Sequence, residues 1–248
     1  MANLTLVVPV FNESSRWSDR YWSELADLQM IRLVFVNDGS TDDSQRLLEN
    51  FNKRRENCFL INLSNNVGKA EAIRTGLAWA TKRDVDLVGF LDADGAFDLV
   101  EVKEIVLLAI SSFSNALSPN SFWTSRVQLL GNNIQRRQSR HYIGRVIHTI
   151  IGFWIKDLPY DSQCGFKIFK SNEDLAHSII RTFRTRWFVD LEMLVRLRAI
   201  NPKYEVKEIP LKNWFDVPNS KIGLKSVLTV LRDLWLLIRE SKLIASKQ

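Results

Sequence analysis

Short apolar runs alternate with longer amphipathic segments over the first hundred residues of the chain. The runs are rich in β-branched residues and bounded by turn residues, as is typical of buried strands, and the segments between them show helical spacing of apolar residues. The predicted strands cover 4–10, 31–36, 59–63 and 85–91, and the predicted helices cover about 16–28, 43–55 and 70–80. This alternation predicts an α/β fold with a mainly parallel sheet and right-handed crossovers.

The alternation becomes less regular after residue 95. The pattern there predicts a helix over about 99–111, a strand over 121–125, helical segments within 135–155, near 173–183 and from about 186, a loop from 213 and a C-terminal amphipathic helix. No repeat, low-complexity tract or linker divides the chain. We therefore expect one α/β domain over residues 1–215, followed by a loop and an amphipathic helix over residues 216–248.

Composition and charge restrict the possible classes of protein. The 248 residues are 46% hydrophobic, enough for a large folded core, and 34 Lys and Arg against 28 Asp and Glu give a net charge of +6, which favours anionic partners. Two cysteines and three histidines form no metal-binding or disulfide pattern. Neither a signal peptide nor an apolar run of about 18 residues is visible, so we expect a cytoplasmic protein without a membrane span.

Two carboxylates follow directly after the fourth predicted strand, in Leu91-Asp-Ala-Asp-Gly95. Because side chains alternate along a strand, Asp92 and Asp94 lie on the same side of the chain. We expect them at the carboxyl edge of the sheet, where open α/β sheets bind ligands. Oxygen ligands of this kind suit a hard divalent cation that carries phosphate oxygens, whereas the alternative is an ordinary solvated turn.

Two further carboxylates follow predicted strands at the same edge. Glu13 comes after the first strand and Asp38 after the second, where a P-loop or a dinucleotide-binding motif would have glycines. Negative charge concentrated in this way needs cationic ligands or hydrogen-bond donors. The sequence therefore predicts that a base, a ribose and a metal-bound diphosphate occupy this edge of the sheet.

Four motifs follow one another in the first half of the chain: Val8-Pro-Val-Phe-Asn-Glu13, Val36-Asn-Asp-Gly-Ser-Thr-Asp42, Asn66-Val-Gly-Lys-Ala-Glu-Ala-Ile-Arg74 and Leu91-Asp-Ala-Asp-Gly95. In this order they resemble the signatures of family 2 glycosyltransferases with the GT-A fold. The second half contains Ser125-Arg126, Asp161-Ser-Gln-Cys-Gly-Phe-Lys167, Trp187-Phe-Val-Asp-Leu-Glu192 and Ser220-Lys221. These segments are similar to the dolichyl-phosphate glucose synthase branch of that family.

The resemblance implies that the donor nucleotide lies against the first strands. The backbone near Pro9 and Val10, together with Glu13 and Asp38, would bind the nucleoside, because acidic hydrogen-bond acceptors suit uracil N–H and ribose hydroxyl groups. Asp92 and Asp94 would hold the sugar-nucleotide and a Mg²⁺ or Mn²⁺ ion, which stabilises charge on the leaving diphosphate. Point charge near the phosphates would come from Lys69, Lys167 and Lys221.

For the acceptor, the resemblance implies that Arg126 grips a phosphate with its planar guanidinium group. Asp161 would act as a base or orient Arg126. The implied activity is that of an inverting enzyme that moves a hexose, glucose from UDP-glucose above all, to a polyprenyl phosphate at the cytosolic face of a membrane. One alternative is a soluble transferase that acts on a glycan hydroxyl. Another is a basic nucleotide- or nucleic-acid-binding module without catalysis, but the acidic strand ends argue against nucleic acid as a partner.

The C-terminal helix is the expected membrane contact. From residue 224 its apolar positions follow helical spacing, while Lys225, Arg232 and Arg239 recur every seven residues along another face. This pattern is typical of a helix in a bilayer interface, with Trp235 at headgroup depth and the cations on anionic lipid. A terminal helix that packs on the domain would give a similar pattern, so both interpretations stay open.

Overall fold

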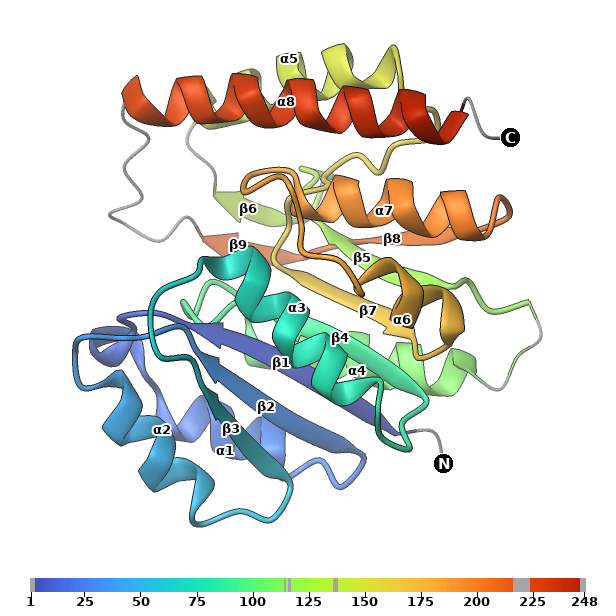
Figure 1. The fold of residues 1–248 in the computed structure, drawn as a ribbon. Coiled ribbons are helices and arrows are strands. Elements are labelled where there is room, and N and C mark those ends of the chain that lie inside the picture. Colours follow the sequence, from blue (N-terminus) through green and yellow to red (C-terminus); the bar gives the residue numbers. More distant parts are fainter. Residues whose placement is uncertain (1–2, 114, 116, 136–137, 216–223, 246–248) are drawn as a thin grey trace.

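The computed structural model describes residues 3–113, 115, 117–135, 138–215 and 224–245 (Figure 1). Its centre is a seven-stranded sheet with the order β3-β2-β1-β4-β7-β5-β8. The strands are β1 (Leu4–Val10), β2 (Ile31–Asn37), β3 (Cys58–Asn62), β4 (Leu87–Leu91), β5 (Ser121–Ser125), β7 (Phe166–Lys170) and β8 (Val206–Pro210). Only β7 runs antiparallel to its neighbours in this sheet, so the predicted mainly parallel α/β fold is confirmed.

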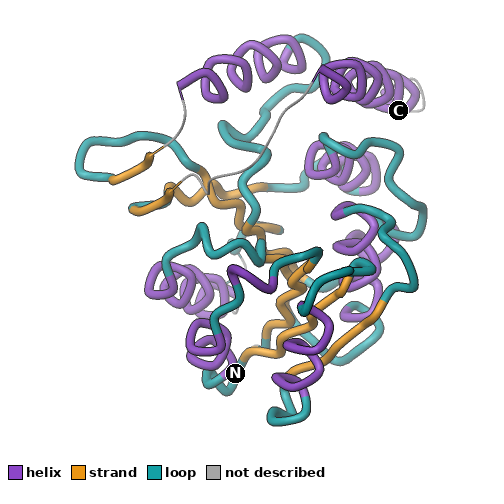
Figure 2. Tube along the Cα trace, turned by 90° about the vertical axis from the view of Figure 1, so that its left-hand side faces the viewer, coloured by secondary structure: helices purple, strands orange, loops and turns teal. Residues whose placement is uncertain are grey.

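Helices cover both faces of the sheet, as the view in Figure 2 shows. They are α1 (Asp19–Ala26), α2 (Ser44–Asn52), α3 (Lys69–Ala80), α4 (Leu99–Phe113), α5 (Gln138–Gly152), α6 (Glu173–Ser178), α7 (Val189–Ile200) and α8 (Leu224–Ala245). One core lies between the sheet and α1, α2 and α4, and the other lies between the sheet and α3, α6 and α7. In β1 the two faces alternate, since Leu6 belongs to the first core and Val7 to the second. Apolar residues on both faces explain why the central strands read as continuous apolar runs.

Several predicted elements have different bounds in the structure, among them the following three. Helix α1 begins at Asp19 rather than Arg16, because a 3₁₀ turn (Ser14–Arg16) precedes it and the Ser18 side chain accepts the N–H of Tyr21 as the helix cap. Helix α6 ends at Ser178, earlier than the predicted 183. The predicted loop from 213 contains β9 (Asn213–Phe215), which pairs with β6 (Asn133–Gln135) in a small second sheet.

Helix α8 lies at the end of the molecule opposite β3, as Figure 1 shows, and it packs against α7. Leu237 and Asp233 are buried, and Asp233 Oδ2 accepts the backbone N–H groups of Arg186 and Trp187 at 2.6 and 2.9 Å. Trp235 is 58% exposed on the outer side. The helix therefore packs on the domain and still presents apolar surface outward. Among the helices described, none combines the length and apolar content needed to cross a membrane.

Candidate active site

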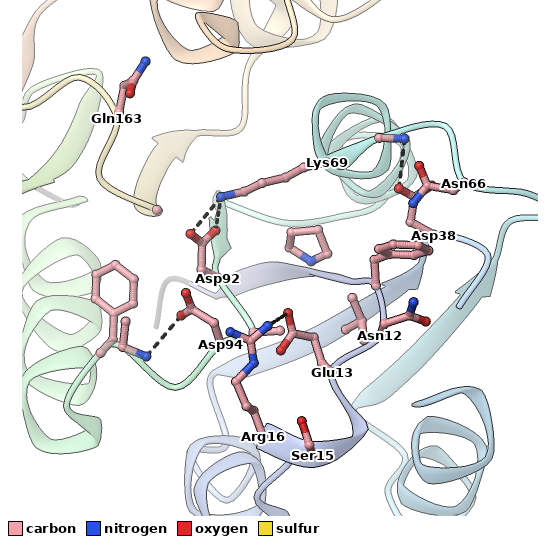
Figure 3. Close-up of a pocket in the computed structure, with 18 of the residues that line it drawn as sticks. Asn12, Glu13, Ser15, Arg16, Asp38, Asn66, Lys69, Asp92, Asp94 and Gln163 are labelled. Carbon is pink, nitrogen blue, oxygen red and sulfur yellow. Dashed lines mark hydrogen bonds and ion pairs between the residues drawn. The ribbon is translucent and has the colours of Figure 1, made fainter. Parts of the chain in front are cut away.

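A cleft of about 1050 Å³ lies at the carboxyl ends of β1, β2 and β4 (Figure 3). Its lining residues come from both halves of the chain. Of the residues predicted from the sequence, the cleft is lined by Pro9, Val10, Glu13, Asp38, Lys69, Asp92, Asp94 and Arg126. Lys221 lies outside the described residues. The acidic strand ends therefore do converge, as the parallel topology predicts.

Asp92 and Asp94 extend into the cleft from the end of β4 (Figure 3). Lys69, the first residue of α3, places its Nζ 2.6 Å from Asp92 Oδ1 and 2.7 Å from Oδ2. Asp94 Oδ1 accepts the N–H of Ala96 at 3.1 Å, and Gly95 turns the chain with a φ of 75°, which favours glycine. The carboxylate of Asp92 is thus neutralised by the Lys69 ammonium group, whereas no ion pair of Asp94 is found among the described residues.

Glu13 adds a third carboxylate to this part of the cleft. Its Oε1 lies 2.5 Å from Arg16 Nη2, whereas its Oε2 is buried and has no hydrogen-bond partner among the described residues. Burial, with a smaller effect of Asp94 and Asp92, raises the pKa of Glu13 although Arg16 opposes this. Burial and the charge of Asp92 likewise raise the pKa of Asp94. Both shifts have the same main cause, the burial of a carboxylate, and the neighbouring carboxylates add to it.

A hard divalent cation fits these residues. The described residues contain no group of three side chains that would bind a metal by themselves. Mg²⁺ and Mn²⁺ do not require such a group, because Mg²⁺ usually takes one or two carboxylates and completes its shell with phosphate oxygens and water. Asp92 and Asp94 are the carboxylates that would hold the ion, and the unpartnered Oε2 of Glu13 fits an added positive charge in the cleft.

Asp38 is 2% exposed and holds a loop of the cleft wall. Its Oδ1 accepts the N–H of Val67 at 2.8 Å, and its Oδ2 accepts the N–H of Gly68 at 2.9 Å. From the sequence we expect a carboxylate that is open to the base or the ribose. Since both oxygens already have donors, the structure indicates that Asp38 shapes this wall of the cleft through the loop that leads into α3.

Arg126 follows β5 and is clamped by Asp161. Asp161 Oδ2 accepts the Arg126 backbone N–H at 3.0 Å and its Nε at 2.6 Å, and Oδ1 accepts Nη2 at 2.8 Å. The guanidinium carbon also lies 4.9 Å from the centre of the Trp214 ring. Of the two roles expected for Asp161, the geometry supports orientation of Arg126.

Lys167 does not reach the cleft, and its predicted contact with phosphate is wrong. It points from β7 into the core beside α7, with its side chain fully buried. The Nζ lies 2.6 Å from both Asp190 Oδ1 and the Cys164 carbonyl oxygen, over the rings of Phe90 and Trp123. Lys167 sits on a central strand whose two faces are both covered, so its charge is balanced by the partly buried Asp190 and not by a ligand.

Several residues of the site were missed by the sequence analysis. Gly165 packs directly on Asp92: an added Cβ would lie 2.0 Å from Oδ2, and the Gly165 carbonyl accepts the Asp92 N–H at 3.0 Å. Trp214 and Gln163 also line the cleft. Gly165 lies inside the motif of residues 161–167, so a signal was present, but Trp214 has no local signal because β9 brings it to the cleft.

The sheet is mainly parallel, and an acidic pair at the end of a central strand faces a wide cleft. This arrangement is that of the GT-A glycosyltransferases, the class to which the similar solved structures belong. Residues 5–170 match the model of the family described as glycosyl transferase family 2. The match covers well over half of the chain, so the chain belongs to this family.

Two relatives named dolichyl-phosphate beta-glucosyltransferase match most of the chain. That of Trichomonas vaginalis is 30% identical over 240 residues, which cover 93% of this chain and 71% of the relative. That of Saccharomyces cerevisiae is 29% identical over 241 residues, which cover 89% of this chain and 69% of the relative. The expected resemblance to this branch of the family is thereby confirmed.

Solved structures confirm the fold. Glucosyl-3-phosphoglycerate synthase from Mycobacterium tuberculosis, in complex with phosphoglyceric acid, has a TM-score of 0.70 at 15% identity. The superposition covers 97% of this chain and 80% of the synthase chain. The same enzyme with Mn²⁺, uridine diphosphate and phosphoglyceric acid has a TM-score of 0.60, also at 15% identity, and covers 94% and 78%. At such identities the likeness concerns the fold alone.

Proposed function

We propose that this glycosyltransferase moves glucose from UDP-glucose to a polyprenyl phosphate with inversion at the sugar carbon. The observation that carries the proposal is the order of groups along the sheet. Asp38 follows β2, Asp92 follows β4 and Arg126 follows β5, and all three line one cleft. Nucleoside, diphosphate and an anionic acceptor can therefore lie in this order across it. The names of the curated relatives support the lipid phosphate acceptor and the glucosyl group.

Each side chain has a defined task in this reaction. Asp92 and Asp94 would hold a Mg²⁺ or Mn²⁺ ion, which would stabilise the charge of the leaving diphosphate. Lys69 is held beside Asp92 and adds positive charge at the same place. Arg126 binds the acceptor phosphate, aligned by Asp161. A phosphate oxygen is already anionic near neutral pH, so the acceptor needs alignment more than a general base.

A screen of donors and acceptors tests the proposal. Radiolabelled UDP-glucose, UDP-galactose, UDP-N-acetylglucosamine and GDP-mannose are each incubated with a polyprenyl phosphate in detergent, with Mg²⁺, with Mn²⁺ or with excess EDTA. We expect label in the lipid fraction with UDP-glucose and a metal only. Transfer to a glycan hydroxyl without transfer to polyprenyl phosphate would contradict the proposed acceptor, and full activity in EDTA would contradict the metal.

We also propose that the protein binds the cytosolic face of a membrane through the outer side of α8. Leu231 and Trp235 are 56% and 58% exposed, and Arg232 and Arg239 are exposed beside them. The Arg239 guanidinium carbon lies 5.3 Å from the Trp235 ring centre, so the cation and the aromatic ring could lie at the same depth in a bilayer. Apolar groups next to cations suit the headgroup region of an anionic bilayer. The side chain of Lys225 lies outside the described residues.

Sedimentation with vesicles tests the membrane contact. Wild-type protein is expected to sediment with vesicles of anionic lipid at low salt and to be released by changing Arg232 and Arg239 to Glu. The matched control changes Arg20 and Arg46 to Glu, because these cations are exposed on α1 and α2, far from α8 in Figure 1. Equal partitioning of wild type and both variants would contradict a contact through α8.

A further inference from the structure

Glu208 of β8 holds the loop that carries Asp161. Its Oε2 accepts the N–H of Tyr160 at 2.8 Å, and its Oε1 accepts the N–H of Asp161 at 3.1 Å. One carboxylate thus binds two successive backbone N–H groups. Strand β8 is the neighbour of β5, and Glu208 is in register with Trp123, three residues before Arg126. The carboxylate therefore joins the sheet that carries Arg126 to the loop that clamps it.

Helix α5 also contacts this loop, at Pro159 and Tyr160. His148 Nε2 lies 2.9 Å from the Pro159 carbonyl oxygen, and Arg145 lies over the Tyr160 ring with its guanidinium carbon 4.2 Å from the ring centre. Both residues belong to α5. Glu208 ties the loop to β8 through the N–H groups of Tyr160 and Asp161.

The position of the Asp161 carboxylate depends on this connection. Asp161 makes three hydrogen bonds to Arg126, one to its backbone and two to its guanidinium group. A shift of the loop backbone moves the acceptor atoms of Asp161 and turns the guanidinium plane. A planar group binds phosphate with two parallel hydrogen bonds only when its orientation is correct, so a small rotation weakens the binding of the phosphate.

We propose that Glu208 is a positioning residue that sets the orientation of Arg126 for the acceptor phosphate, acting through the backbone of residues 160–161 and the Asp161 carboxylate. It touches no substrate. This inference rests on the proposed function, in which Arg126 binds the acceptor. It assigns a role to a residue of β8, a strand that the motifs of the family do not include.

Glu208→Gln is the informative substitution. The amide keeps the size of the side chain but offers one acceptor and one donor, so one of the two N–H groups of the loop faces an N–H₂ group. The KM for a polyprenyl phosphate acceptor is expected to rise about tenfold, with kcat and the affinity for UDP close to wild type. Glu208→Asp keeps both carboxylate oxygens, so its KM for the acceptor is expected to lie between those of the wild type and Glu208→Gln. Glu205→Gln is the matched control, since Glu205 is exposed in the segment before β8.

A double-mutant cycle with Arg126→Ala separates positioning from a general structural role. If Glu208 acts through Arg126, Glu208→Gln raises the acceptor KM in the wild-type background and not in the Arg126→Ala background. Equal effects in both backgrounds, or a loss of UDP affinity to the same extent, would overturn the inference. If Arg126→Ala itself leaves the acceptor KM unchanged, the proposed acceptor site fails. If Arg126→Ala raises it and Glu208→Gln does not, only the inference about Glu208 fails.

Discussion

Substitution of Gly165 by Ala tests how closely the reaction depends on the position of the Asp92 carboxylate. Gly165 precedes β7 and lies against Asp92, and its φ is outside the left-handed region, so alanine meets no backbone strain there. The added methyl group would meet Asp92 Oδ2 at 2.0 Å and Cγ at 2.2 Å. The backbones are joined by the hydrogen bond from Asp92 N–H to the Gly165 carbonyl, so the carboxylate is the part that must move.

The size of the movement follows from the contact distance. Cβ atoms in proteins essentially never come closer than 3.0 Å to another heavy atom, so Oδ2 has to move by at least 1.0 Å from its position at 2.0 Å. That movement breaks the contact of Lys69 with Asp92 and displaces one of the two predicted metal ligands. Misplacement of a catalytic group by roughly 1 Å costs about 100-fold in rate, which corresponds to about 2.7 kcal/mol of transition-state stabilisation.

The assay is transfer of radiolabelled glucose from UDP-glucose to polyprenyl phosphate at varied Mn²⁺ concentration. We expect Gly165→Ala to lower kcat/KM about 100-fold and to raise the Mn²⁺ concentration needed for half activity. Gly144→Ala is the control, because an added Cβ there meets nothing within 4 Å and α5 continues on both sides. Wild-type kcat/KM in Gly165→Ala, with circular dichroism unchanged, would show that catalysis does not need this carboxylate position.

Three further predictions concern other parts of the site. Asp94→Asn is expected to abolish metal-dependent transfer without lowering the melting temperature. Burial raises the pKa of Asp94, so its ionised form costs stability in the protein without a metal ion. An active variant would refute the metal assignment. Asp38→Asn is expected to weaken UDP binding, measured by calorimetry, and to lower stability by about 1–3 kcal/mol, since one N–H of the loop loses its acceptor; unchanged UDP affinity would contradict this. Arg126→Ala is expected to reduce turnover more than Asp161→Asn, and the opposite order would indicate a hydroxyl acceptor that needs a base.

The first four strands were predictable because each is a local pattern. Apolar runs such as Leu87–Leu91 are buried on both faces of the sheet. A carboxylate directly after such a run therefore lies at the end of the strand. The antiparallel direction of β7 was not predictable in this way. Nothing in Phe166–Lys170 records direction, which is set by the long connection through α5 and by pairing with both β4 and β5.

Lys167 shows why charge alone is a poor guide to a site. In the sequence it ends a motif that contains Asp161 and Gly165, and a lysine there indicates a phosphate contact. In the fold, alternate residues of β7 face opposite cores, so Lys167 faces α7 and meets Asp190. A lysine in a strand that is covered on both sides is buried whichever way it points. Its partner lies 23 residues away, and no local pattern connects the two.

The two sides of the cleft differ in how they are assembled, and this bears on the proposed acceptor site. On the proposed donor side, Asp38, Lys69 and Asp92 each lie in a short motif, directly after a strand or at the start of a helix, so the sequence alone indicates them. The acceptor side has no such motif for most of its support: Trp214 comes from β9, and β9 is fixed to α4 because Glu101 accepts the backbone N–H groups of Lys212 and Asn213. Substitutions in β8 or β9 can therefore move Arg126 and Trp214 without touching the groups that we propose to bind the nucleotide. A change of acceptor is expected to appear first in these strands.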